Sequence, residues 1–137
     1  MSNSEQPTRG IDHVGLTVFS LAESLAFFKD ALGWKETGGK PDYPAAFVSD
    51  GAGVVTLWEV RDRESSVGFD RHRNIGLHHL ALRVPSEARL IELFERVSRW
   101  PRVEVEFAPE PSGKGPKIHF MIREPGGNRI EFAWDPR

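Results

Sequence analysis

Apolar and polar residues alternate along several short runs of the chain, and this period of two predicts β-strands. Residues 11–18 (IDHVGLTV) and 76–84 (GLHHLALRV) show the pattern most clearly. Asp50-Gly51 is a strong hairpin signal between two such runs. The remaining runs predict strands near residues 34–37 and at residues 45–50, 53–60, 103–107, 117–124 and 129–134.

Two longer stretches instead repeat their apolar residues at helical spacing. In the first, at residues 20–34 (SLAESLAFFKDALGW), Ser20 and Glu23 have the spacing of a capping box, and Gly33 ends the run. The second lies at residues 85–99 (PSEARLIELFERVSR). We expect one helix in each stretch.

The same order of elements occurs twice along the chain. Residues 11–60 and 76–134 each predict strand–helix–strand–strand–strand, and we interpret the charged segment at residues 61–75 as a linker. Residues 1–10 are polar and predict a flexible leader. The repeat favours an α+β fold with two βαβββ modules in one compact domain, because each module buries a sheet face only against the other module or a partner chain.

Composition and charge narrow the classes of function. The chain has 137 residues, a formal net charge of −2 and no cysteine. Such a charge gives no general attraction to nucleic acid or to an anionic membrane, no apolar run approaches the length of a membrane span, and the polar start lacks the core of a signal peptide. The lack of cysteine excludes disulfides and thiolate ligands and fits the cytoplasm. We therefore expect a cytoplasmic protein with a small-molecule partner, and any metal held by nitrogen and oxygen.

The repeat also pairs two histidines. HVGLTV in the first strand superimposes on HLALRV in the first strand of the second module, which pairs His13 with His79 and Gly15 with Ala81. Glu131 alternates with apolar neighbours in the last strand, so its carboxylate lies on the face opposite theirs. Two imidazoles and a carboxylate can hold Fe, Mn, Ni or Zn and leave positions open for water or substrate. We predict a divalent metal held by His13, His79 and Glu131, with Glu131 also a candidate base.

Several other side chains are candidates for a role toward a substrate. His119 could act as a general acid or base if its strand face looks into the site, and it is an ordinary surface histidine if it looks outward. Arg83 and Arg129 could bind a substrate carboxylate or phosphate. Trp58 and Phe47 could wall an apolar pocket, and core packing is the alternative role for them.

The stretches HVGLTVFSLAESLAFFKDALGW, HHLALRV and EPGGNRIEF together resemble the vicinal oxygen chelate superfamily, the group of glyoxalases, bleomycin resistance proteins and extradiol dioxygenases. The resemblance implies two βαβββ modules that form a cupped mixed sheet around a central divalent metal. It further implies ligands from the first strand of each module and from the final strand. These positions are His13, His79 and Glu131.

One departure from the resemblance concerns a fourth ligand. Glyoxalase I members carry it, usually as Glu, on the last strand of the first module, where this chain has Glu59 one or two places late. A shift of one residue turns a strand side chain to the other face, so Glu59 fits only if a bulge intervenes. Neither His78, on the face opposite His79, nor His72, in the linker, is expected to be a ligand.

Two functions from different classes follow. The first is a metal-dependent enzyme, an isomerase or lyase or a ring-cleaving dioxygenase, whose small substrate chelates the metal through adjacent oxygens. The alternative is a metal-free protein that sequesters an antibiotic or small metabolite, and a purely structural domain would require the three ligand-type residues to be accidental. We expect a homodimer, and the sequence leaves open whether each site is built within one chain or across two.

Overall fold

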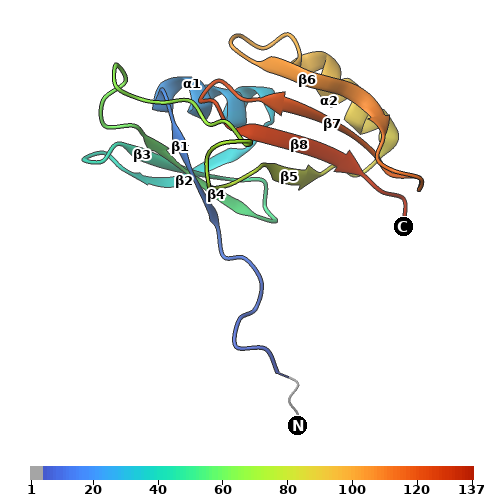
Figure 1. Cartoon of the computed structure of the whole chain (residues 1–137). Helices are drawn as coiled ribbons and strands as arrows, with labels where there is room; N and C mark the ends of the chain where they lie inside the picture. Colours follow the sequence, from blue (N-terminus) through green and yellow to red (C-terminus); the bar gives the residue numbers. More distant parts are fainter. Residues whose placement is uncertain (1–4) are drawn as a thin grey trace.

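The computed structural model describes residues 5–137. The first four residues of the expected leader lie outside the described residues. Residues 5–10 are exposed and form neither helix nor strand, and this segment runs away from the two sheets (Figure 1). No helix in the described part of the chain is long and apolar enough to cross a membrane.

The first module contains a four-stranded sheet in the order β1-β4-β3-β2. Strand β1 runs parallel to β4, and the other neighbours are antiparallel. The Asp50-Gly51 signal falls in the β3–β4 hairpin loop, where the Asp50 carboxylate accepts two backbone N–H groups. The elements are β1 (Val14–Val18), α1 (Leu21–Ala26), η2 (Phe27–Ala31), β2 (Lys35–Lys40), β3 (Ala45–Ser49) and β4 (Val54–Glu59).

The second module repeats this arrangement in the order β5-β8-β7-β6, again with its first and last strands parallel. The expected α+β fold of two βαβββ modules is thereby confirmed. Figure 1 shows the two sheets side by side, each with its own helix. The elements are β5 (Leu80–Arg83), α2 (Glu87–Val97), β6 (Glu104–Pro111), β7 (Ile118–Arg123) and β8 (Arg129–Trp134).

Each sheet packs one face on its helix and leaves the other face open. In β1, Leu16 and Val18 are buried whereas Gly15 and Thr17 are exposed, as the alternation predicts. Helix α2 packs on the second sheet, and its buried Leu90 belongs to the same core as residues of both modules. The open faces therefore carry the polar candidates, and the helix-covered faces form one continuous hydrophobic core.

The first helix departs from the expected regular form. Its α-helical part ends at Ala26 and continues as a π-helical segment through Ala31. The adjacent Phe27 and Phe28 are both fully buried. The wider π-helical turn directs two neighbouring aromatic rings toward the core. The spacing of apolar residues alone does not predict this local adjustment.

The turn between β7 and β8 ties the second module to the first. Buried Glu124 accepts hydrogen bonds from the Ser24 hydroxyl of α1 and from the backbone N–H groups of Gly126 and Asn128. The Asn128 side chain donates to the Thr17 carbonyl in β1 at 3.0 Å. A Cβ atom on Gly126 would lie 2.6 Å from the Val18 Cβ, so glycine is required by close approach rather than by the turn alone.

Strand β6 is longer and less regular than expected. It extends to Pro111, four residues beyond the end of the strand expected at residues 103–107. Its pairing with β7 shifts register between Val105 and Phe107 and again before Glu110. The first shift leaves Glu106 in a bulge without a ladder partner, and its carboxylate contacts Arg129 of β8.

Candidate metal centre

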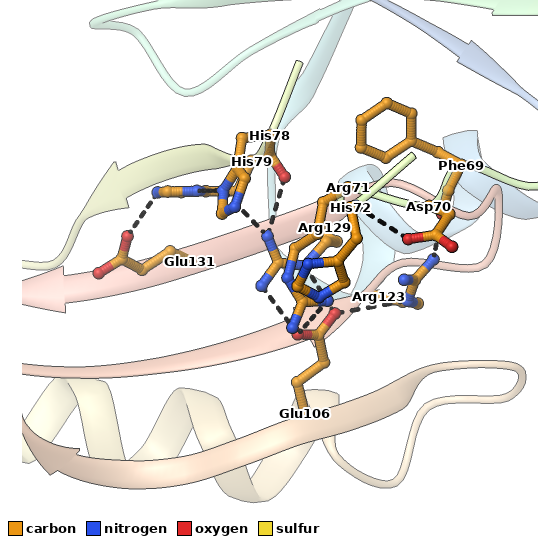
Figure 2. Close-up of polar contacts among 10 residues, drawn as sticks. All are labelled: Phe69, Asp70, Arg71, His72, His78, His79, Glu106, Arg123, Arg129 and Glu131. Atoms are coloured by element: carbon orange, nitrogen blue, oxygen red, sulfur yellow. Dashed lines mark hydrogen bonds and ion pairs between the residues drawn. The ribbon is translucent and has the colours of Figure 1, made fainter. Parts of the chain in front are cut away.

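Two of the three predicted ligands lie together on the open face of the second sheet. Strands β5 and β8 pair with Ala81 opposite Glu131, and His79 immediately precedes β5. The His79 Nε2 and the Glu131 Oε1 are 3.0 Å apart, and Glu131 is only 8 % exposed (Figure 2). Two donor atoms that each lie about 2.1 Å from one metal ion, with an angle of about 90° at the ion, are separated by about the distance found between these two atoms.

The hydrogen bonds behind His79 set its tautomer for the same role. Arg129 Nη1 lies 3.1 Å from His78 Nδ1, and because a guanidinium only donates, this nitrogen accepts. His79 Nδ1, 2.8 Å from the same atom, must then carry the proton. The His79 Nε2 is left with its lone pair facing the Glu131 carboxylate. Two lone-pair donors in contact are stable only with a cation, a proton or a metal, beside them, so the pair fits a divalent ion.

His79 owes this geometry partly to an unexpected contact. The alternation of a strand would place His78 on the opposite face, but both histidines precede β5, and their rings meet edge to face with centroids 5.0 Å apart. Partial desolvation, the Arg129 guanidinium and the neighbouring His79 lower the pKa of His78. A lowered pKa favours the neutral ring, and hence the acceptor role of His78.

His119 also lies on the open face of the sheet. Its Nδ1 is 2.6 Å from Glu131 Oε2, and its ring packs against Phe107 with centroids 4.7 Å apart. Of the two orientations left open by the sequence, the structure has the one beside the predicted ligand. Glu131 thus contacts a different histidine with each of its oxygens.

The third predicted ligand, His13, does not join this group. Its side chain is half exposed and its Nδ1 contacts Asp12 at 2.7 Å. Across residues 5–137, no group of three or more His, Asp or Glu side chains is arranged to hold a metal ion. His13 immediately precedes β1, whose exposed Gly15 and Thr17 lie on the open face of the first sheet.

The strand register also identifies the residue of the first module that corresponds to Glu131 of the second module. Gly15, the repeat partner of Ala81, pairs with Thr56, so Thr56 is the counterpart of Glu131. The pairing of β4 shows no bulge, and Glu59 points to the helix side, where it accepts the Leu21 N–H at 2.9 Å. This hydrogen bond and the Arg63 guanidinium hold the pKa of Glu59 below its usual range. Glu59 caps a helix.

Arg129, a candidate for substrate binding, is buried and engaged with protein groups. Its Nε and Nη2 atoms donate to both oxygens of Glu106 at 2.8 and 2.9 Å, and its Nη1 donates to the His78 carbonyl. The Arg129 hydrogen bonds lower the pKa of Glu106, and Arg71 and Arg123 add to that effect. Arg129 therefore supports the His78 segment from beneath it (Figure 2).

The other substrate candidates lie elsewhere on the open faces. Trp58 donates through its Nε1 to the Thr56 hydroxyl and contacts the rings of Tyr43 and Phe47, so these aromatics share one wall. Arg83 is exposed and lines a cavity of about 540 Å³ between the two modules. His13 and Ala81 line the same cavity.

Sequence reasoning missed His78 as a partner of His79 and missed the group of Glu106, Arg71 and Arg123. The strand pattern VEVEF carries two glutamates, and nothing in it distinguishes Glu106 from Glu104. Arg71 lies in the segment interpreted as a linker, and nothing in that segment indicates that it contacts the second sheet.

The fold and the face on which these residues gather define a class of protein: a paired βαβββ protein with a metal-type donor pair on the open face of one sheet. The family model of the Glyoxalase/Bleomycin resistance protein/Dioxygenase superfamily matches residues 10–132. The chain belongs to this superfamily.

Three proteins are similar to this chain in sequence or in fold. The uncharacterized protein YqjC of Bacillus subtilis (strain 168) is 28% identical over 129 residues, which cover 90% of each chain. A glyoxylase/bleomycin resistance protein/dioxygenase domain from Frankia sp. EAN1pec superimposes with a TM-score of 0.75 at 27% identity, covering 95% of this chain and 94% of that one. A mutant of the fosfomycin resistance protein FosX from Listeria monocytogenes, complexed with Mn(II) and 1S,2S-dihydroxypropylphosphonic acid, has a TM-score of 0.68 at 18% identity, covering 91% and 89%, and shares the fold.

Proposed function

We propose that this protein is a divalent-metal-dependent enzyme of the glyoxalase/dioxygenase type, an isomerase or lyase or a ring-cleaving dioxygenase. The metal is Fe, Mn, Ni or Zn, and the substrate is a small molecule that chelates it through two adjacent oxygens. The observation that carries the proposal is the 3.0 Å contact between His79 Nε2 and Glu131 Oε1, two atoms that can both ligate a metal ion.

The proposed ligands are His13, His79 and Glu131, and a bound metal would stabilise an enediolate or similar anion of the substrate. His119 is the proposed acid or base. With its Nδ1–H donated to Glu131, its Nε2 carries the lone pair that accepts a substrate proton. Arg83 is a proposed contact for an anionic part of the substrate, and Trp58 with Phe47 a proposed apolar wall.

Because one chain does not bring His13 to the other two ligands, we further propose that the site is shared between two copies in a homodimer. His13 of one copy would face His79 and Glu131 of the other. Two observations support this arrangement: Glu131 lies on the face of the second sheet that its helix does not cover, and His13 immediately precedes the first strand of the other sheet.

Metal content is the first test. Wild-type protein purified without added metal or chelator is expected to hold close to one divalent metal per chain, and His13→Ala, His79→Ala and Glu131→Ala are each expected to lose it. Iron would direct the substrate search to catechol cleavage, and Ni, Zn or Mn to isomerases. Wild-type protein that neither retains nor takes up Fe, Mn, Ni or Zn would overturn the proposal in favour of a metal-free binding protein.

A mixed dimer tests the sharing of the site. When His13→Ala chains are paired with His79→Ala chains, a shared site leaves one of the two positions with all three native ligands, so half of the wild-type metal is expected. If each site lies within one chain, both are damaged and the mixed dimer binds none. Once a substrate is known, His119→Gln is expected to retain the metal and lower kcat by about 10²- to 10⁴-fold.

A further inference from the structure

Three arginines surround one carboxylate beside the candidate metal centre. Arg129 of β8 makes the two short contacts to Glu106 described above, while Arg123 Nε of β7 lies 3.4 Å from Oε2 and Arg71 Nη1 of the linker 3.8 Å from Oε1. We call Arg71, Arg123 and Arg129 the arginine cluster. It joins two strands and the linker on the open face of the second sheet (Figure 2).

The charges of this cluster are not balanced by the protein groups around it. Glu106 offers one negative charge to three guanidinium groups. Asp70 lies nearby in Figure 2, where its carboxylate accepts the His72 N–H, and Glu104 is the ladder partner of Arg123. Within residues 5–137, neither of these two carboxylates forms an ion pair with an arginine of the cluster. An excess of positive charge on a partly desolvated surface is unfavourable unless an anion completes it.

Two arginines of the cluster, Arg71 and Arg123, have N–H groups that can bind a ligand. Arg129 is almost fully buried and each of its three nitrogens donates to a protein group, whereas the side chains of Arg123 and Arg71 are 26 % and 31 % exposed. Arg123 also donates one Nη1–H to the Phe69 carbonyl at 3.2 Å. The remaining N–H groups of Arg71 and Arg123 have no other partner in the described part of the chain. They present the planar fork that binds carboxylates and phosphoryl groups.

A short path of contacts joins the cluster to the metal ligands. Arg129 Nη1 is 3.1 Å from His78 Nδ1, which is 2.8 Å from His79 Nδ1. Resting on the function proposed above, we propose that the arginine cluster binds an oxyanion of the substrate, a carboxylate or phosphoryl group, while the adjacent oxygens of the same molecule occupy the metal centre. The substrate class is then an anionic vicinal-oxygen compound, and Arg71 and Arg123 are its specificity-determining residues.

The first experiment separates this subsite from the metal. Metal-free full-length protein is titrated with inorganic phosphate and, separately, acetate at constant ionic strength, and the arginine Nε–H resonances are followed by NMR. We expect saturable binding of at least one anion, weakened about tenfold in Arg71→Gln and in Arg123→Gln. The matched control is Arg89→Gln, an exposed arginine on α2, which is expected to bind as wild type does. The tighter of the two anions distinguishes a phosphoryl group from a carboxylate.

The failures of the two proposals can be told apart. His79→Ala and Glu131→Ala are expected to keep the phosphate or acetate affinity and lose Mn(II), while Arg71→Gln and Arg123→Gln keep Mn(II) affinity. Absence of saturable anion binding, or equal affinity in Arg71→Gln, Arg123→Gln and Arg89→Gln, overturns the anion subsite. Wild-type protein that binds phosphate or acetate but does not bind Mn(II) overturns the metal centre alone.

A matched pair of chelating probes tests the link between the two sites. On Mn(II)-loaded protein, 3-phosphoglycerate is expected to bind about tenfold more tightly than glycerate, since only the former adds an oxyanion to the hydroxy-acid chelate. Arg71→Gln and Arg123→Gln should remove this difference. A preference that is absent in the wild type, or unchanged in both variants, overturns the link between the arginine cluster and the metal-bound molecule.

Discussion

The Nδ1 atoms of His78 and His79 lie 2.8 Å apart, with Arg129 donating to the first of them. We predict that His78→Leu, which removes the acceptor for His79 Nδ1–H, weakens Mn(II) binding about 10- to 100-fold, because the partner that fixes a ligating imidazole is lost. Isothermal titration of apo-protein measures the change. His72→Leu, an exposed linker histidine, is the control and should bind as wild type does. Complete loss of binding, as expected in His79→Ala, would instead make His78 a ligand.

Glu59 gives the second prediction, because its position suggested a fourth ligand and its contacts indicate a helix cap. Glu59→Ala should leave Mn(II) affinity unchanged and lower the free energy of unfolding by about 1 kcal/mol, since the Leu21 N–H loses its acceptor. Urea denaturation and metal titration on the same samples measure the two effects. Glu64→Ala, at an exposed residue nearby, should change neither. A metal affinity lowered as far as in Glu131→Ala would restore Glu59 as a ligand.

Gly126 gives the third prediction. In Gly126→Ala the new Cβ would lie 2.6 Å from the Val18 Cβ and closer still to the Ser24 hydroxyl, so either the β7–β8 turn or α1 must move. We expect a loss of about 2 kcal/mol in the free energy of unfolding. Gly53→Ala is the matched control, because nothing lies within 4 Å of its added Cβ. If both variants unfold at the same urea concentration, the Gly126 turn does not pack closely against β1 and α1.

Much of the architecture follows from the sequence because it depends on periodicity. The alternation in residues 11–18 and 76–84 fixes which side chains share a face, and the same pattern places Glu131 opposite its apolar neighbours. The repeated order of elements specifies two sheets with the same strand order, as found. Of the proposed ligands, Glu131 is accordingly on the open face of its sheet.

The rest depends on departures from periodicity and on contacts distant in sequence. His78 and His79 precede their strand, so alternation does not apply to them. Glu106 reaches Arg129 because β6 bulges at that point, and a bulge has no reliable sequence signal. Arg71 acts from an irregular segment whose path is set by tertiary contacts. The group around Glu106 was therefore not predictable residue by residue.

Glu106 itself carries the last prediction. Its pKa in the folded protein is lowered, first by the Arg129 hydrogen bonds and then by the charges of Arg129, Arg71 and Arg123, with burial opposing them. A carboxyl whose pKa is lower in the folded than in the unfolded chain stabilises the fold above its unfolded pKa. That stability is lost as the pH falls through the folded pKa. The free energy of unfolding should therefore decrease with acid from about pH 5 downward.

Glu106→Gln should remove that contribution and leave the Arg129 guanidinium, almost completely buried, without its counter-charge. We expect a loss of about 3 kcal/mol at neutral pH and a smaller difference from wild type as the pH is lowered. Urea denaturation of both proteins from pH 7 downward measures the difference between their free energies of unfolding. Because the other carboxyls titrate in both proteins, this difference reports on Glu106. Glu104→Gln, at an exposed position on the same strand, is the control. A Glu106→Gln difference that stays constant with pH would mean that Glu106 stabilises the fold through packing rather than through its charge.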